Sequence, residues 1–285
     1  MFLDIPALPA SLPSLLSWVT ALATQQLTPS TVKSYLGGVR SFHVDAGFPQ
    51  SSLEIFHAPL LKRLLAGLQR ENGRQRRERQ PITRDILLRL VTRYTDRDFQ
   101  REATFRAAFS LAFAAFLRVG EFTYTDRNQP GFATRHMTRG GVTFTADNSI
   151  DLLVPASKTD PFGNGVVVKV ASTGDAACPV ENLRHLFDHF PASPEAPLFT
   201  LPEGNFTREA VVRELQSSLR ALGFSGQYSG HSFRRGAATA ARDAGLSDSE
   251  IMALGRWKSD AFRLYIDVKP SYLLAASRRH QGALT

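Results

Sequence analysis

Four cationic side chains are candidates for binding an anion: Arg118, Lys158, His231 and Arg234. Arg118 directly follows the apolar stretch AAFSLAFAAFL. At the end of a buried helix, an arginine needs either a counter-charge or an anionic ligand. Glu121 lies about one helical turn further on and can be that counter-charge. A structural ion pair is therefore the alternative to a ligand site at Arg118.

His231 and Arg234 are three residues apart, which places them on one face of a helix. Both lie near a predicted helix N-terminus, where the helix dipole also favours an anion. The alternative is a capping histidine beside a surface arginine. The spacing alone does not separate these two interpretations.

Several common catalytic motifs are missing from the sequence. It contains no H-E-x-x-H motif, no P-loop and no G-x-G-x-x-G followed by an acidic residue. Residues 230–232 begin like a hydrolase nucleophile elbow, but Arg234 stands where that elbow needs glycine. A single cysteine, Cys178, excludes an internal disulfide and a cysteine-rich zinc site. The sequence predicts no metal site and no cofactor.

The composition indicates a basic globular protein. The 285 residues are 43% hydrophobic and 21% charged, and this length suggests about two domains. Lys and Arg number 34 against 26 Asp and Glu, a net charge of +8. Such an excess is typical of proteins with polyanionic partners, nucleic acid first, and the equally open alternative is a solvated basic surface. With no apolar run long enough to span a bilayer and no signal-peptide pattern, we expect an intracellular protein.

The first 72 residues predict a small helical bundle. Apolar residues recur at helical spacing over 11–26, 29–46 and 58–68. The basic residues available for the surface of this bundle, and so candidates for contacting nucleic acid, are Lys33, Arg40, Lys62 and Arg63.

Residues 70–84 predict a linker, because Gly73 and Pro81 interrupt any helix and no apolar periodicity is present. The segment contains six arginines against two glutamates, which suits it to crossing a phosphate backbone. The alternative is a solvated connector. The arginines predicted to contact DNA are Arg74, Arg76, Arg77 and Arg79.

The remainder predicts a larger domain, mainly helical with a small antiparallel sheet. Helices are expected at 83–95, 98–117, 180–190, 207–222, 232–244, from Ser247 to Gly255, at 259–266 and at 270–280. Strands are expected at 141–145, 150–154 and 166–170, the last two as a hairpin.

Four short segments, in this order and spacing, resemble the tyrosine recombinases, also called phage-type integrases. The segments are LRVGE at 117–121, SKTD at 157–160, HSFRRGAATA at 231–240 and LGRWKSDAFRLYI at 254–266. The resemblance covers the whole chain. It implies a helical core-binding, SAM-like DNA-binding domain over 1–72, an arginine-rich linker over 73–82 and a catalytic domain over 83–285. The last segment looks most like recombinases of eukaryotic mobile elements, the Crypton and DIRS-like groups.

The resemblance also implies the catalytic roles. Arg118 and Arg234 would neutralise the phosphate without metal, and His231 and Trp257 would add hydrogen-bond donors. Tyr265 would attack the phosphorus, Lys158 would protonate the leaving 5′ oxygen, and Glu121 would orient Arg118 or His231.

Two features depart from the family pattern. Trp257 stands where many members carry histidine, and Trp257 and Tyr265 are eight residues apart where many bacterial members have nine. Tyr272 is the alternative nucleophile, and Lys169 is the alternative lysine.

The resemblance implies an enzyme that cuts and rejoins double-stranded DNA through a 3′-phosphotyrosine, for integration or excision of a mobile element. It implies a tetramer on DNA, a monomer without DNA and no membrane partner. The protein would be nuclear in a eukaryotic element and otherwise cytoplasmic, at the nucleoid. The alternatives are a non-cutting DNA-binding protein on the same scaffold and a monomer like type IB topoisomerases.

Overall fold

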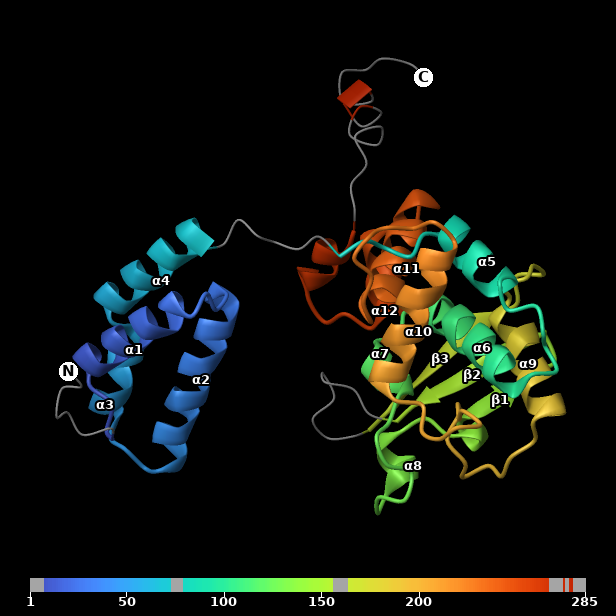
Figure 1. Ribbon diagram of the computed structural model, residues 1–285, viewed down its shortest axis with the longest axis horizontal. Helices are drawn as coiled ribbons and strands as arrows, with labels where there is room; N and C mark the ends of the chain where they lie inside the picture. Colours follow the sequence, from blue (N-terminus) through green and yellow to red (C-terminus); the bar gives the residue numbers. More distant parts are fainter. Residues whose placement is uncertain (1–7, 73–78, 156–163, 267–273, 275–276, 279–285) are drawn as a thin grey trace. The chain divides into compact units, whose positions relative to one another are not determined.

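The computed structural model describes residues 8–72, 79–155, 164–266, 274, 277 and 278. The chain divides into two compact units, Met1–Arg77 and Glu78–Thr285 (Figure 1).

The smaller unit is a helical bundle with its own apolar core. It consists of α1 (Leu12–Thr24), α2 (Pro29–Asp45), α3 (Gln50–Glu54), the 3-10 helix η1 (Ile55–His57) and α4 (Pro59–Asn72). Thr28 caps α2 through its hydroxyl, and Pro29 occupies the first turn, where a missing N–H costs nothing. The three long helices agree with the sequence prediction, whereas α3 and η1 were not predicted. The buried core residues are Leu15, Val19, Leu22, Val32, Leu36, Leu61 and Leu68.

The larger unit combines helices with one small sheet. Its helices are α5 (Arg84–Thr92), α6 (Gln100–Ala114), α7 (Val119–Phe122), α8 (Phe132–Arg135), η2 (Arg139–Gly141), α9 (Pro179–His189), α10 (Arg208–Ala221), α11 (Ser232–Asp243), α12 (Asp248–Gly255) and η3 (Asp260–Tyr265). Ser247 and Glu250 form the predicted capping box at the start of α12.

The sheet is antiparallel, in the order β1-β2-β3. β1 (Val142–Phe144) pairs with β2 (Ser149–Val154), and β2 pairs with β3 (Val166–Ala171). The predicted hairpin of the second and third strands is therefore confirmed. α9 packs against β3 and α6, so the sheet joins the helical core of this unit (Figure 1).

The helix predicted over 98–117 is confirmed as α6, but it ends at Ala114, because the chain turns sharply after that residue. Phe116 adopts a left-handed conformation with φ of 51°. The N–H of Leu117 donates to the carbonyl of Ala112, and that of Phe116 to Phe113. This pattern is a Schellman motif, which usually has glycine at the left-handed position. Arg118 consequently lies before the short helix α7, not at the end of α6.

The chain between 79 and 82, predicted as the end of the linker, is held to the larger unit. The N–H of Gln80 donates to the carbonyl of Gln227, and that of Ile82 to the carbonyl of Ser232. Ile82 is fully buried. Gly236 on α11 allows this close approach, since a Cβ there would collide with the carbonyl of Ile82.

The helix predicted over 270–280 lies outside the described residues except for Leu274, Ser277 and Arg278, which are helical. Within the described part of the chain, no helix is long and apolar enough to cross a membrane.

Gly236→Ala should destabilise the larger unit, by about 1–3 kcal/mol, because the added methyl group overpacks against main chain that cannot rotate away. Urea denaturation of the full chain measures this change. Gly37→Ala is the control, since nothing lies within 4 Å of a Cβ on this helical glycine and alanine is the better helix former. Equal stability of Gly236→Ala and the unmodified chain would contradict the close approach at Ile82.

Candidate functional site

Glu121 is a buried carboxylate shared by two arginines. Its Oε1 lies 2.9 Å from Nη1 of Arg118, and its Oε2 lies 2.8 Å from Nη2 of Arg256. Its Oε2 also accepts the backbone N–H of Arg118 at 2.9 Å. The Glu121 side chain is 5% exposed and the Arg118 side chain 22%. Glu121 therefore fixes Arg118 in place, while Arg118 still reaches solvent.

Arg234 is a fully buried arginine held by helix ends instead of a carboxylate. Its Nη1 donates to the carbonyl of Phe116 at 2.5 Å, and its Nη2 donates to the carbonyl of Gly255. Carbonyls at helix C-termini have no partner within the helix and carry partial negative charge, so they suit a cation. Burial, and after it the charge of Arg118, nevertheless lower the pKa of Arg234 to about 10. Its Nε has no hydrogen-bond partner among the described residues.

Aromatic side chains cover this guanidinium. Arg234 lies 4.1 Å from the ring centre of Trp257 and 6.0 Å from that of Tyr265. The Trp257 and Tyr265 rings are 5.6 Å apart. Gly255 makes room for the indole, because a Cβ there would collide with the Trp257 ring. Phe262 lies between Trp257 and Tyr265 in the sequence. Its side chain is fully buried and anchors this segment to the apolar core formed with α11 and α12.

His231 lies among positive charges and next to the tyrosine. Its ring centre is 6.3 Å from that of Tyr265. Burial lowers the pKa of His231, and the positive charges of Arg79, Arg208, Arg118 and Arg234 lower it further. The imidazole is therefore neutral at pH 7 and has one N–H to donate. Such a concentration of cations is a site for an anion.

The structure brings together six of the seven residues predicted as catalytic. They are Arg118, Glu121, His231, Arg234, Trp257 and Tyr265. Lys158 and the alternative nucleophile Tyr272 lie outside the described residues. The alternative lysine, Lys169, is on β3, where its Nζ lies 2.9 Å from the Asp151 carboxylate across the sheet. Its charge is thus already compensated.

The residues predicted to contact DNA are divided between the units. Lys33, Arg40, Lys62 and Arg63 are exposed in the smaller unit. Lys33 and Arg40 are seven residues apart on α2 and so share one face. Arg79 instead donates to the Ser229 hydroxyl at 3.3 Å, in the larger unit and within electrostatic reach of His231. Arg74, Arg76 and Arg77 lie outside the described residues.

Sequence reasoning missed two arginines, Arg256 and Arg208. Arg256 follows the last residue of α12 in a left-handed conformation with φ of 56°. Besides Glu121, it contacts the carbonyl of Ala115 at 3.0 Å, which ties α12 to the end of α6. Its position just after Gly255, where a cation complements the helix dipole, was the available signal. Arg208 opens α10, and no sequence pattern distinguishes it.

Comparison with solved structures gives the fold. The XerA recombinase structure matches with a TM-score of 0.52 and 15% identity, covering 95% of this chain and 99% of that one. The XerH site-specific recombinase bound to palindromic difH substrate, a post-cleavage complex, matches with a TM-score of 0.65 and 13% identity, covering 95% and 72%.

The Tn1549 transposon integrase in complex with circular intermediate DNA has a TM-score of 0.59 and 13% identity, covering 96% of this chain and 87% of that one. No protein-family model and no curated protein matches the sequence. Across most of its length the chain thus has the mainly helical fold, with a small antiparallel sheet, of the tyrosine recombinases.

His231 should make the larger unit less stable in acid. Its folded pKa is below the ordinary value of about 6.5, so the unfolded chain takes up a proton first as the pH falls. Stability therefore decreases as the pH falls below about 6.5. His231→Gln should show a shallower decrease of Tm with falling pH than the unmodified chain.

Two further histidine variants complete this measurement. His136 also has a pKa lowered chiefly by burial, so His136→Gln should flatten the profile as well. His57, exposed in the smaller unit, provides the control variant His57→Gln. A profile unchanged by His231→Gln would contradict the buried, neutral imidazole.

Arg256 should be coupled energetically to Glu121. Arg256→Gln leaves a buried carboxylate with one partner fewer and should cost about 3–5 kcal/mol. Adding Glu121→Gln removes that carboxylate, so the double variant should be more stable than the sum of the two single changes predicts. Urea denaturation of all four chains measures the coupling. Strict additivity would show that the 2.8 Å contact contributes nothing.

Proposed function

We propose that the protein cuts and rejoins double-stranded DNA through a covalent bond between Tyr265 and a 3′ phosphate. The observation that carries this proposal is the placement of the Tyr265 ring beside His231, Trp257 and the buried Arg234. A phosphodiester bears negative charge that grows as a fifth oxygen attacks the phosphorus. A cluster rich in guanidinium groups stabilises that charge.

The proposed reaction uses the residues as follows. The phenolic oxygen of Tyr265 forms a bond to phosphorus and loses its proton to solvent water, and the bond from phosphorus to the 5′ oxygen breaks. The 5′ oxygen must gain a proton as it leaves, the role that we propose for Lys158. Arg118 donates to the non-bridging oxygens, and Glu121 and Arg256 hold Arg118 in position. Rejoining reverses these steps.

In the proposed reaction, Arg234 stabilises the phosphate with its positive charge, although the Trp257 ring covers its guanidinium. Its side chain is fully buried, so its N–H groups reach a phosphate only after Trp257 leaves the face of the guanidinium. Its unpartnered Nε is available for that contact. Even in the closed arrangement its positive charge acts on the site, since burial weakens screening by water.

We further propose that the smaller unit is a core-binding domain over residues 1–72. Its exposed cations Lys33, Arg40, Lys62 and Arg63 would contact the phosphate backbone, together with Arg74, Arg76 and Arg77 of the segment 73–82. Strand exchange needs two cleavages on each of two duplexes, so four protomers would assemble on DNA. The solved complexes of XerH and the Tn1549 integrase with DNA support a DNA partner.

We also propose that this reaction serves to integrate or excise a mobile element. The segment at 254–266 supports a eukaryotic element, for which the protein would be nuclear.

One observation favours a second candidate, a DNA-binding protein on this scaffold that does not cut. Arg234 is 0% exposed and both of its terminal nitrogens are bonded to main-chain carbonyls. A permanently closed arrangement would bind DNA through its surface cations without catalysis.

Incubation with a nicked suicide DNA substrate separates these candidates. The unmodified chain should form a covalent protein–DNA adduct, and Tyr265→Phe should abolish it while leaving DNA affinity nearly unchanged, because only one hydroxyl is lost. Tyr272→Phe, which removes the alternative nucleophile, is the matched control and should form the adduct.

A chelator arm tests the cationic mechanism, since arginines and not Mg²⁺ would neutralise the phosphate. The adduct should form at an undiminished rate in the presence of EDTA. An adduct that persists in Tyr265→Phe would reject Tyr265 as the nucleophile. DNA binding with no adduct in any variant would favour the non-cutting protein.

A further inference from the structure

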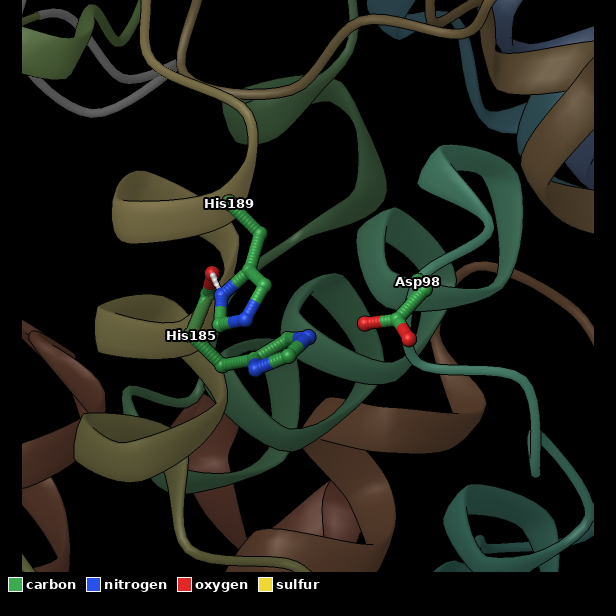
Figure 2. A group of neighbouring side chains, drawn as sticks. All are labelled: Asp98, His185 and His189. Carbon is green, nitrogen blue, oxygen red and sulfur yellow. Dashed lines mark hydrogen bonds between the residues drawn. The ribbon is translucent and has the colours of Figure 1, made fainter.

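Asp98, His185 and His189 form a cluster of metal-ligating side chains in the larger unit (Figure 2). His185 and His189 are four residues apart on α9, so they project from one face of that helix. Asp98 lies in the segment between α5 and α6 and points toward the two rings (Figure 2). One donor atom from each residue lies within 4.8 Å of the others.

Both imidazoles are anchored through one ring nitrogen. Nδ1 of His189 lies 3.1 Å from the carbonyl oxygen of His185, and Nε2 of His185 lies 2.8 Å from the carbonyl oxygen of Arg97. A carbonyl oxygen only accepts, so each of these nitrogens carries the proton. The second nitrogen of each ring then carries the lone pair. Metal-ligating histidines are typically oriented in this way by a backbone carbonyl.

The Asp98 carboxylate is not used elsewhere in the described part of the chain. No hydrogen bond or ion pair to a described residue involves its side-chain oxygens, whereas its backbone N–H is fixed by Asp96 at 3.2 Å. Asp98 and His189 are exposed and His185 is half-buried. A free carboxylate beside two anchored imidazoles is therefore open to an ion from solvent.

The donor set identifies the class of ion. Two imidazole nitrogens and one carboxylate oxygen suit Zn²⁺, with water at the fourth position, and suit Mg²⁺ or Ca²⁺ poorly. Tetrahedral zinc with bonds of 2.0–2.1 Å places its donors about 3.3 Å apart. The rings are stacked, 3.9 Å between centres, and must turn to meet this geometry; His189 and Asp98 are exposed and have room to do so, whereas half-buried His185 need move less.

We propose that Asp98, His185 and His189 bind a divalent transition-metal ion, Zn²⁺ by preference. The ion would connect helix α9 with the segment that lies before α6. It lies at the N-terminal end of α6, whereas Arg234 and Arg256 contact carbonyls just beyond the C-terminal end. Fifteen residues of α-helix separate these ends by about 22 Å, so the ion takes no part in chemistry at Tyr265. The proposal is independent of the proposed function.

Zinc titration of the full chain, after chelation and removal of the chelator, tests this site. Competition with a chromophoric zinc indicator gives the stoichiometry and affinity, and thermal unfolding gives the shift of Tm. We expect saturable binding with a component of one Zn²⁺ per chain, and a Tm that rises with Zn²⁺ concentration, since the ion binds the folded state.

The exposed ligands provide variants that keep the fold. His189→Gln and Asp98→Asn should each weaken this binding by at least about 10–100-fold. Losses of that size are typical when a residue that only hydrogen-bonds to a zinc ligand is removed, and here the ligand itself is removed. Both should lose the zinc-dependent shift of Tm while unfolding like the unmodified chain without zinc. Asp188→Asn, the neighbouring exposed carboxylate on α9, and His57→Gln are the matched controls and should bind zinc normally.

Two results would overturn the proposal. The first is the absence of saturable binding at micromolar Zn²⁺. The second is binding that His189→Gln and Asp98→Asn leave unchanged, which would place the ion elsewhere on the chain. Because the variants leave Tyr265 untouched, failure here would not alter the adduct assay that tests the proposed function.

Discussion

The arrangement of the candidate site depends on one constraint, the buried positive charge of Arg234, which forms no ion pair with a carboxylate among the described residues. Arg234 donates to the carbonyl of Phe116, two residues beyond the end of α6, and to that of Gly255, the last residue of α12. Both carbonyls are available because each helix closes with a non-glycine residue in the left-handed conformation, Phe116 and Arg256. Such backbone costs about 1–3 kcal/mol per residue and persists where the surrounding structure demands it. The guanidinium of Arg234, the two helix ends and the turns that follow them therefore depend on one another.

The positive and negative charges around Arg234 do not balance. Glu121 is the carboxylate that pairs with Arg118 and with Arg256, and no described carboxylate forms an ion pair with Arg79, Arg208 or Arg234. A second buried carboxylate would have neutralised Arg234 and made the cluster a purely structural ion-pair network. Its absence from the described residues leaves excess positive charge at His231, whose pKa is lowered chiefly by burial and further by those arginines. Under the proposed function, the phosphates of DNA would supply the missing negative charge.

Sequence patterns predicted the parts of the fold that local chemistry determines. The alternating strands of the hairpin and the capping box at Ser247 are local signals, and both are present. The break after α6 was missed because Phe116 has no propensity for a left-handed turn, and only the tertiary demand of Arg234 for its carbonyl explains it. Arg256 was missed for the same reason. Its position after Gly255 was a local signal for a cation, but its pairing with Glu121, 135 residues away in the chain, is a tertiary contact that no local pattern predicts.

The cover over Arg234 and the proposed nucleophile belong to one short segment, residues 257–265. Trp257 stacks on the guanidinium at one end, Tyr265 lies near it at the other, and buried Phe262 fastens the segment between them. The carbonyl of Tyr265 also accepts a hydrogen bond from Thr239 on α11 at 3.5 Å. A movement of Trp257 that exposes Arg234 to a phosphate would therefore take place in the same short segment that carries the tyrosine. Under the proposed function, exposure of the cation and presentation of the nucleophile are coupled by the chain itself. In that proposal, a phosphate that binds Arg234 in an open arrangement would also stabilise the conformation in which Tyr265 can attack, so DNA binding would select the reactive state.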